Sequence, residues 1–186
     1  MNSIRNKKDL KTIIDYIRSH AYSYLEKYSP SKQQLQTYLF KKILKKNQKQ
    51  YNKKEIFNLI NEVIFTLVDQ KLLSDKYYSD VKARAFLRRG YSLNKIRYSL
   101  IKKGINEKYI DKSISKIKEK ESEPDFFSAI KICKRRRIGP MREESNRSLF
   151  YKKDISILAR SGFSYTTSKT VLNLPKDEFK KFCKLL

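Results

Sequence analysis

Apolar residues recur at every third or fourth position along most of the chain, and this spacing predicts amphipathic helices. Three helices are expected in the first part of the chain. Their buried stripes are Ile13, Ile17, Ala21, Tyr24 and Tyr28, then Leu35, Leu39 and Ile43, then Ile56, Ile60, Val63 and Leu67. Ser31 can cap the second helix and Asn52 the third. Tyr51 and Ile56 are placed as the hydrophobic staple of that third helix.

A second helical group is expected to begin at Ser74, which can cap a helix with Asp75 in its first turn. From there on, one short motif recurs: an apolar residue, three further residues, a glycine, an apolar residue, and Ser or Asn. Its copies are Phe86, Gly90, Tyr91 and Ser92; Leu100, Gly104, Ile105 and Asn106; and Leu158, Gly162, Phe163 and Ser164. A glycine in the left-handed conformation ends a helix, and the next apolar residue packs back on it. Because Ser or Asn then caps the following helix, the motif predicts three minimal helix–turn–helix corners.

The third part of the chain is predicted to hold helices over 126–136 and 149–160, with an irregular segment over 138–147 between them. A further helix should follow Ser164 and carry Val171 and Leu172. Pro175 then opens a last helix, whose buried side is expected to carry Phe179, Phe182 and Leu186.

These elements predict an all-α fold of three tandem three-helix repeats. The expected repeats are residues 9–72, 73–123 and 124–186, the last with a C-terminal extension. Four glycines and four prolines are too few for a turn-rich β-protein. Since short helical units stack on their neighbours, the expected body is elongated and curved.

The formal net charge of +25 indicates a class of partner, because such a charge favours binding to nucleic acid or to an anionic protein surface. Much of the lysine fits the codon usage of an AT-rich genome and says little about function. Arginine is the better signal, since such a genome supplies lysine more cheaply. The arginines cluster at Arg84, Arg88 and Arg89, and at Arg135, Arg136, Arg137 and Arg142.

Catalytic chemistry finds little support in the sequence. The phosphate loop G-x-x-x-x-G-K-[ST], the G-x-S-x-G elbow and the H-E-x-x-H motif are all missing, and His20 is the only histidine. Glu143 and Glu144 fit a solvated surface better than an acid–base pair. Cys133 and Cys183 lack the spacing of metal ligands or of a disulfide framework. We therefore expect no enzymatic activity, no cofactor and no metal site.

The expected location is the cytoplasm. No apolar run approaches the roughly 20 residues of a membrane span, so no membrane association is predicted. Asp9, Lys11 and Asp15 interrupt any apolar stretch that a secretory signal would need near the N-terminus.

Several segments, in this order along the chain, carry a resemblance to a known family. They are Leu72-Leu73-Ser74-Asp75-Lys76-Tyr77-Tyr78, Arg88-Arg89-Gly90-Tyr91-Ser92, Lys103-Gly104-Ile105, the run from Arg135 through Gly139-Pro140 to Arg142, and Leu158-Ala159-Arg160-Ser161-Gly162-Phe163-Ser164. Between the second and third of them, Ile96, Arg97 and Leu100 fit the spacing of an Ile-Arg-x-x-Leu element. Across roughly residues 10 to 175, the chain resembles the regulatory protein RecX family, in its alphaproteobacterial branch.

The resemblance implies a three-repeat, all-α protein that binds RecA on single-stranded DNA. Members of the family are understood to lie in the groove of the RecA filament across adjacent protomers. There they suppress ATP hydrolysis, strand exchange and co-protease activity. The implied partners are the RecA filament and, through weak or indirect contact, single-stranded DNA; a monomer is expected.

The predicted contact residues are all basic. They are Arg84, Arg88, Arg89, Lys95, Arg97, Lys102, Lys103, Arg135, Arg136, Arg137, Arg142 and Arg160. Aromatic residues such as Tyr77, Phe86 and Phe163 are expected to fill cores instead of stacking on bases. The alternative is an independent nucleic-acid-binding protein. It would lack sequence specificity, because the helix after Gly104 carries a mixed set of charges with little base-reading chemistry.

Overall fold

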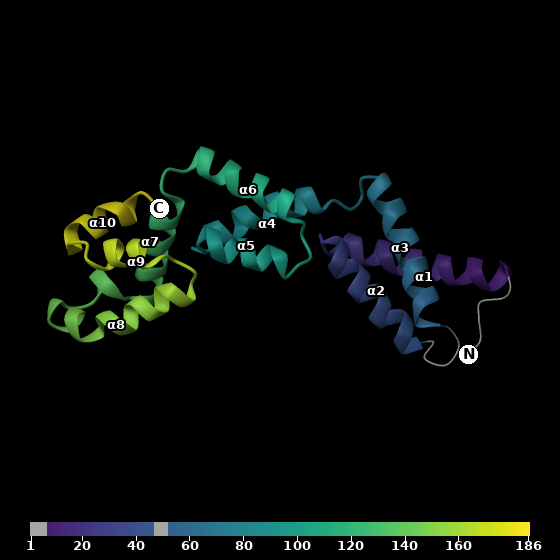
Figure 1. Ribbon diagram of the computed structural model, residues 1–186, viewed down its shortest axis with the longest axis horizontal. Helices are drawn as coiled ribbons and strands as arrows, with labels where there is room; N and C mark the ends of the chain where they lie inside the picture. Colours follow the sequence, from purple (N-terminus) through teal and green to yellow (C-terminus); the bar gives the residue numbers. More distant parts are fainter. Residues whose placement is uncertain (1–6, 47–51) are drawn as a thin grey trace. The chain divides into compact units, whose positions relative to one another are not determined.

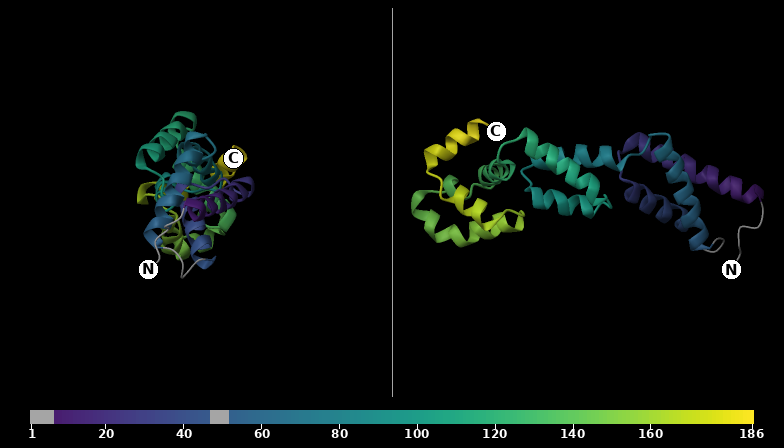
Figure 2. Two further views of the ribbon diagram at one scale, coloured as in Figure 1. Left: turned by 90° about the vertical axis from the view of Figure 1, so that its right-hand side faces the viewer. Right: turned by 45° about the horizontal axis from the view of Figure 1, so that its top comes forward.

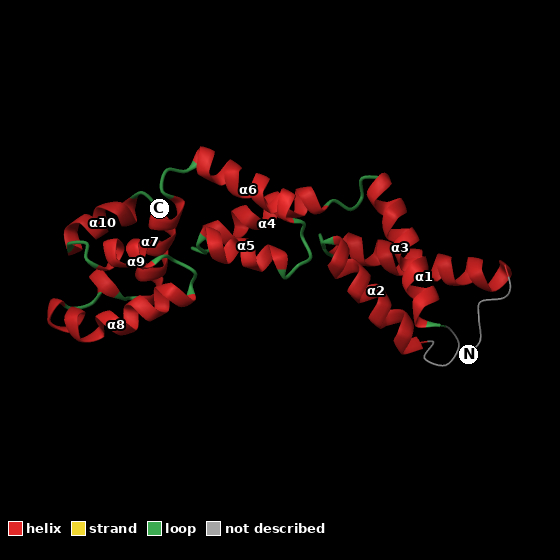
Figure 3. Cartoon of the chain, viewed as in Figure 1, coloured by secondary structure: helices red, strands yellow, loops and turns green. Residues whose placement is uncertain are grey.

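The computed structural model describes residues 7–46 and 52–186, and every regular element in these two ranges is helical (Figures 1 and 3). The elements are α1 (Lys7–Lys27), α2 (Lys32–Lys46), α3 (Lys53–Asp69), α4 (Asp75–Arg88), α5 (Leu93–Ile101), α6 (Glu107–Lys120), α7 (Pro124–Arg136), a single 3₁₀ turn η1 (Gly139–Met141), α8 (Glu144–Arg160), α9 (Tyr165–Leu172) and α10 (Lys176–Lys184). The all-α class is thereby confirmed. Across the described ranges, no helix is both long and apolar enough to span a bilayer.

The chain divides into two compact units. Unit 1 comprises residues 1–78 and 103–106, and unit 2 comprises residues 79–102 and 107–186. The division into three repeats is a finer statement, and it stays a prediction.

Unit 1 is built around α1, α2 and α3, which lie side by side in the views of Figures 1 and 2. The predicted stripes form its core, since Ile17, Leu39 and Ile60 are each fully buried. Tyr28 is the exception: α1 ends at Lys27, and the Tyr28 side chain is 57% exposed. The core therefore follows the helical spacing up to the point where the helix stops.

Helix caps in both units follow the sequence prediction. The Ser31 hydroxyl accepts the Gln34 amide of α2 at 3.2 Å, and the Asn52 side chain accepts the Lys54 amide of α3 at 3.0 Å. The caps at Ser74, Ser92 and Ser164 likewise accept the amides of Tyr77, Lys95 and Thr167. Asn106 directly precedes α6 and its cap stays a prediction, while Tyr51, the predicted half of the α3 staple, lies outside the described residues.

Two of the three glycine corners have the bonds of a Schellman turn. The Gly90 amide donates to the Leu87 carbonyl at 2.8 Å, and the Tyr91 amide donates to the Phe86 carbonyl at 3.0 Å. Gly162 and the residue after it repeat this pair of bonds at the end of α8. Gly90, Gly104 and Gly162 all have φ between +73° and +84°, so the predicted left-handed glycines are confirmed.

The end of unit 2 packs α7, α8, α9 and α10 around one core, and Figure 1 shows these four helices grouped together. Phe179 of α10 is fully buried in this core, and the ring of Phe182 meets the ring of Phe126 edge-on at 5.1 Å. The residues after Pro175 therefore share a core with α7 to α9. Burial also raises the pKa of the Cys133 thiol to about 12, so this residue packs as a small apolar side chain.

Besides Tyr28, three sequence predictions differ from the structure. α8 begins at Glu144 and not at 149, so the irregular segment is shorter than predicted. The reason is a long-range contact: the Arg147 guanidinium donates to the carbonyls of Leu172 and Leu174, each at 2.9 Å, which holds the first turns of α8 against the end of α9.

The other two differences concern side-chain burial. Tyr77 was expected in a core but is 67% exposed, because its neighbour Tyr78 occupies the inward face of α4 at 6% exposure. Leu186 was expected on the buried side of the last helix. It lies after the end of α10 at Lys184 and is 43% exposed.

Candidate interaction surface

The end of α4 presents two arginines to solvent. Arg88 is the last residue of the helix and Arg89 follows it, and both side chains are exposed. The corner behind them is closed by ring packing: the rings of Phe86 and Tyr91 stack in parallel, with centroids 5.1 Å apart and an interplanar angle of 3°. This ring contact is the apolar closure that a Schellman turn requires.

The same corner rests on α7, which brings a second group of arginines to it. A Cβ atom on Gly90 would lie 3.2 Å from the Ser128 carbonyl oxygen, so the turn touches the α7 backbone. The Arg135 guanidinium donates to the Arg89 carbonyl oxygen at 2.9 Å.

Arg136 and Arg137 follow Arg135 at the end of α7, and all three side chains are exposed. We call the five exposed arginines Arg88, Arg89, Arg135, Arg136 and Arg137 the basic corner. Because the charges are held on two helix ends that contact each other, their attraction for an anion adds at one place.

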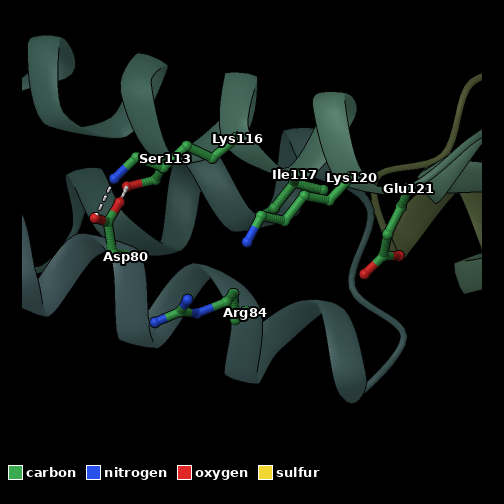
Figure 4. A pocket seen from close by; sticks show the side chains of 7 residues that line it. All are labelled: Asp80, Arg84, Ser113, Lys116, Ile117, Lys120 and Glu121. Carbon is green, nitrogen blue, oxygen red and sulfur yellow. Dashed lines mark hydrogen bonds and ion pairs between the residues drawn. The ribbon is translucent and has the colours of Figure 1, made fainter.

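A cleft of about 90 Å³ lies between α4 and α6 (Figure 4). Arg84 enters it from α4, while Lys116 and Lys120 line it from α6. Asp80 sits at one end, where its carboxylate accepts hydrogen bonds from Ser113 at 2.7 Å and from Lys116 at 2.6 Å.

The carboxyl group of Asp80 is held in its charged form. Burial raises its pKa, but hydrogen bonds from Lys116 and Ser113, together with the charges of Lys116 and Arg84, outweigh burial and leave the pKa below its usual value. Lys116 is thus engaged by an internal partner. Arg84 and Lys120 are the remaining cations of the cleft, and Glu121 is its second acid.

Aromatic and basic side chains alternate along α5 and its flanks. The Lys95 ammonium lies 4.9 Å from the ring centroid of Tyr91, and the Lys102 ammonium lies 4.5 Å from that of Tyr98. The Tyr98 side chain is 58% exposed. We call these four residues the α5 stripe. Each pair is a cation–π contact, which keeps the ammonium group beside the aromatic face.

Arg142 faces inward, unlike the other predicted contact residues. Its guanidinium forms a two-pronged pair with Asp154, through Nε at 2.7 Å and Nη2 at 2.8 Å, and lies 4.5 Å from the ring centroid of Phe150. Asp154 is 1% exposed and also accepts the Gly139 amide at 2.9 Å. Hydrogen bonding and charge from Asp154 raise the pKa of Arg142, so its first role is structural.

The remaining predicted contact residues do not join one cluster. Arg97 forms an ion pair with Asp111, Lys103 belongs to unit 1, and Arg160 is exposed in the last turn of α8. Lys116 and Lys120 of the cleft are contact candidates that were not predicted from the sequence. Their spacing of four places both on one face of α6, but only the packing of α6 on α4 shows that this face meets Arg84.

The fold and this surface define an all-α protein with basic clusters and no sign of a catalytic centre among the residues described.

No family model matches the chain. Curated relatives carry a single name: the chain is 28% identical to the regulatory protein RecX of Myxococcus xanthus over 170 residues, which is 90% of this chain and 89% of that protein. It is also 28% identical to the regulatory protein RecX of Clostridium tetani over 171 residues, with coverages of 89% and 72%.

Solved structures agree with this fold. The RecX structure from Lactobacillus salivarius matches with a TM-score of 0.60 at 17% identity, covering 90% of this chain and 97% of that one. Another structure of a regulatory protein RecX matches with a TM-score of 0.59 at 21% identity, with coverages of 91% and 78%. The chain is thus similar in sequence to curated RecX proteins and shares the fold of two solved RecX structures. The relatives are regulatory proteins, in agreement with the prediction that this chain is not an enzyme.

Proposed function

We propose that this protein regulates RecA filaments on single-stranded DNA in recombination and DNA repair, mainly by inhibiting their recombinase, ATPase and co-protease activities. The similarity to regulatory RecX proteins over about nine tenths of the chain carries this proposal. The relatives come from Myxococcus and Clostridium. The arginine-rich Gly-Pro segment at 135–142 is the feature that favours the alphaproteobacterial branch within the family.

The basic corner and the adjacent cations of unit 2 are the proposed contact surface. A filament of protein on DNA exposes phosphates and acidic side chains, and a surface of fixed arginines attracts both. Arginine also pairs with carboxylate and phosphate through two parallel hydrogen bonds, which fixes orientation as well as charge. Arg88, Arg89 and Arg136 are the residues we expect to carry most of this contact.

Inhibition is proposed to arise from bridging. A chain of three tandem helical repeats over 9–72, 73–123 and 124–186 can contact adjacent protomers of a filament at once. Bridging would hinder the motion between protomers that ATP hydrolysis requires. In this proposal the protein acts as a monomer in the cytoplasm.

A second candidate function is non-sequence-specific binding to nucleic acid alone, and the α5 stripe is the observation that favours it. An exposed tyrosine beside lysines offers a base a ring to stack on and offers the adjoining phosphate a charge. Binding of this kind weakens steeply with salt, because each neutralised phosphate releases counterions.

The two functions are separated by co-sedimentation with RecA, with and without single-stranded DNA and ATP, together with a RecA ATPase assay. The proposed regulator co-sediments with the RecA–DNA filament and lowers its ATPase rate at amounts below one chain per protomer. Tight binding to bare DNA with no change in filament ATPase would contradict the regulator and support the second function.

A further inference from the structure

In unit 1, the N-terminus of α2 is held by two segments that lie far from it in sequence. The Lys32 amide donates to Oδ1 of Asp75, the first residue of α4, at 2.9 Å. The Ser31 hydroxyl donates to the Lys103 carbonyl oxygen at 2.6 Å. Lys103 directly precedes Gly104, and a Cβ atom on that glycine would lie 2.6 Å from Cβ of Gln33. The glycine corner therefore sits against the first turn of α2.

In unit 2, the N-terminus of α5 is held in the same way. The Leu93 amide donates to Oδ1 of Asp125, in the first turn of α7, at 2.7 Å. The Ser92 hydroxyl donates to the Ser161 carbonyl oxygen at 2.9 Å. Ser161 directly precedes Gly162, and a Cβ atom on that glycine would lie 2.5 Å from the Ser92 hydroxyl oxygen.

The two arrangements match part by part. Each has a serine cap, an amide at the first helical position, an aspartate from the first turn of a helix two elements later, and a carbonyl just before a left-handed glycine. We infer that they are two copies of one inter-repeat clamp, in which the aspartate and the glycine corner of one repeat complete the cap of the middle helix of the repeat before it. The first clamp is Ser31, Lys32, Asp75, Lys103 and Gly104; the second is Ser92, Leu93, Asp125, Ser161 and Gly162.

The chemistry of a helix end explains what the clamp achieves. The first amides of a helix have no partner within it. The serine serves one of them, since the Ser31 and Ser92 hydroxyls accept the amides of Gln34 and Lys95. The aspartate from the following repeat serves the amide at the first position and puts a negative charge at the positive end of the helix dipole. The amide at the first position of the middle helix has this partner only when the next repeat is in place.

The clamp also gives a second explanation for glycine at Gly104 and Gly162. A left-handed turn can tolerate Asn, but a side chain at Gly104 or Gly162 would collide with the preceding repeat. Both aspartates share an environment too: burial raises the pKa of Asp75 and of Asp125, and each receives one backbone amide, which lowers it. The match thus extends from geometry to the electrostatics of the carboxyl groups.

The C-terminal extension has an aspartate at the matching helix position that is not part of a clamp. α10 carries Asp177 as its second residue, the position that Asp125 has in α7. The Asp177 side chain is 93% exposed and pairs only at 3.8 Å with Lys180. The residue before α8 is Glu143, whose side chain makes no cap bond. Asp177 therefore stands outside a clamp and offers a matched control.

Amide hydrogen exchange of the full chain tests the clamp directly, with Asp75→Ala, Asp125→Ala and Asp177→Ala compared with the unchanged protein. We expect Asp125→Ala to speed exchange at the start of α5 by about tenfold, because one partly buried hydrogen bond is lost, and to leave the start of α2 unchanged. Asp75→Ala should do the reverse, and Asp177→Ala should change neither.

Asp125→Asn keeps an acceptor oxygen in place, so it should restore slow exchange at the start of α5. The clamp is overturned if Asp125→Ala exchanges like Asp177→Ala, or if it loosens α2 and α5 equally. It is also overturned if Asp125→Asn is no slower than Asp125→Ala, because the acceptor would then be irrelevant.

Discussion

Two parts of one arginine-rich segment behave in opposite ways. Arg135, Arg136 and Arg137 end α7 with their side chains in solvent. Arg142, five residues later, is paired with an aspartate that is 1% exposed. A count of positive charges treats these arginines alike, whereas the structure assigns some to the surface and one to the interior.

Local geometry causes the difference. At the end of α7, positive side chains lie near carbonyl groups that favour them, and they keep their hydration. After η1 the chain runs alongside α8, where the carboxylate of Asp154 is already bound by the Gly139 amide. Arg142 supplies the charge that this buried carboxylate needs. Arg142 is therefore one of the 44 basic residues of the chain whose role is structural.

Removing the interior arginine should have the largest effect. Arg142→Ala leaves the Asp154 carboxylate buried without a cation, so we expect the free energy of unfolding to fall by about 3–5 kcal/mol. Urea denaturation measures this change. The matched control is Arg136→Ala, for which we expect a change within about 0.5 kcal/mol. Equal stabilities of the two variants would remove the distinction between the arginines.

Breaking the turn beneath the basic corner should have the next largest effect. Gly90 has φ of +81°, and a Cβ atom there would press on the Ser128 carbonyl oxygen. A left-handed conformation costs an L-residue about 1–2 kcal/mol, so Gly90→Ala should lower the free energy of unfolding by at least that amount. Thermal unfolding followed by circular dichroism checks it. A melting temperature equal to that of the unchanged protein would contradict the role given to this turn.

Reversing the exposed charges should change binding while leaving stability almost intact. We expect Arg88→Glu with Arg89→Glu to weaken co-sedimentation with the RecA–DNA filament about tenfold, which corresponds to about 1.4 kcal/mol. Lys176→Glu with Lys181→Glu on α10 makes the same change of net charge at exposed positions. If this control weakens binding equally, net charge and not the basic corner determines the contact.

The smallest expected effect is a pH dependence from the cleft. Because the pKa of Asp80 is lowered in the folded state, its contribution is present above the unfolded value near 4 and is lost as pH falls through the folded value. Asp80 and Lys116 have side chains 21% and 51% exposed, so we expect less than about 1 kcal/mol. Urea midpoints for the unchanged protein and Asp80→Asn between pH 5 and 2 test it. Identical slopes would show that Asp80 makes no such contribution.

Features that depend on a few neighbouring residues could be predicted from the sequence. The Gly90 and Gly162 corners and the Ser92 cap involve residues within six positions of one another, so the local pattern contains their causes. The buried stripes of α1 to α3 follow in the same way from helical spacing.

Features that depend on which helix faces which could not be predicted. From the sequence, Arg142 is indistinguishable from a surface cation, because only the packing of η1 and α8 brings Asp154 to it. Likewise, nothing near Arg89 in sequence shows that Arg135 will donate to its carbonyl, and nothing near Lys116 shows that it will face Arg84 across a cleft. The burial of single side chains is equally hard to predict. Tyr77 and Tyr78 are neighbours on α4, and a shift of one residue in the buried face of the helix would exchange their environments.

The most direct test of the proposed outward role of the basic corner is the rate of ATP hydrolysis by RecA on single-stranded DNA. The rate is measured with increasing amounts of the unchanged chain, or of a variant carrying Arg88→Glu, Arg89→Glu and Arg136→Glu. We expect the unchanged chain to suppress hydrolysis. The variant, with its helical circular dichroism spectrum and urea midpoint retained, should suppress it at least tenfold more weakly. Equal suppression by both proteins would contradict the outward role of the basic corner.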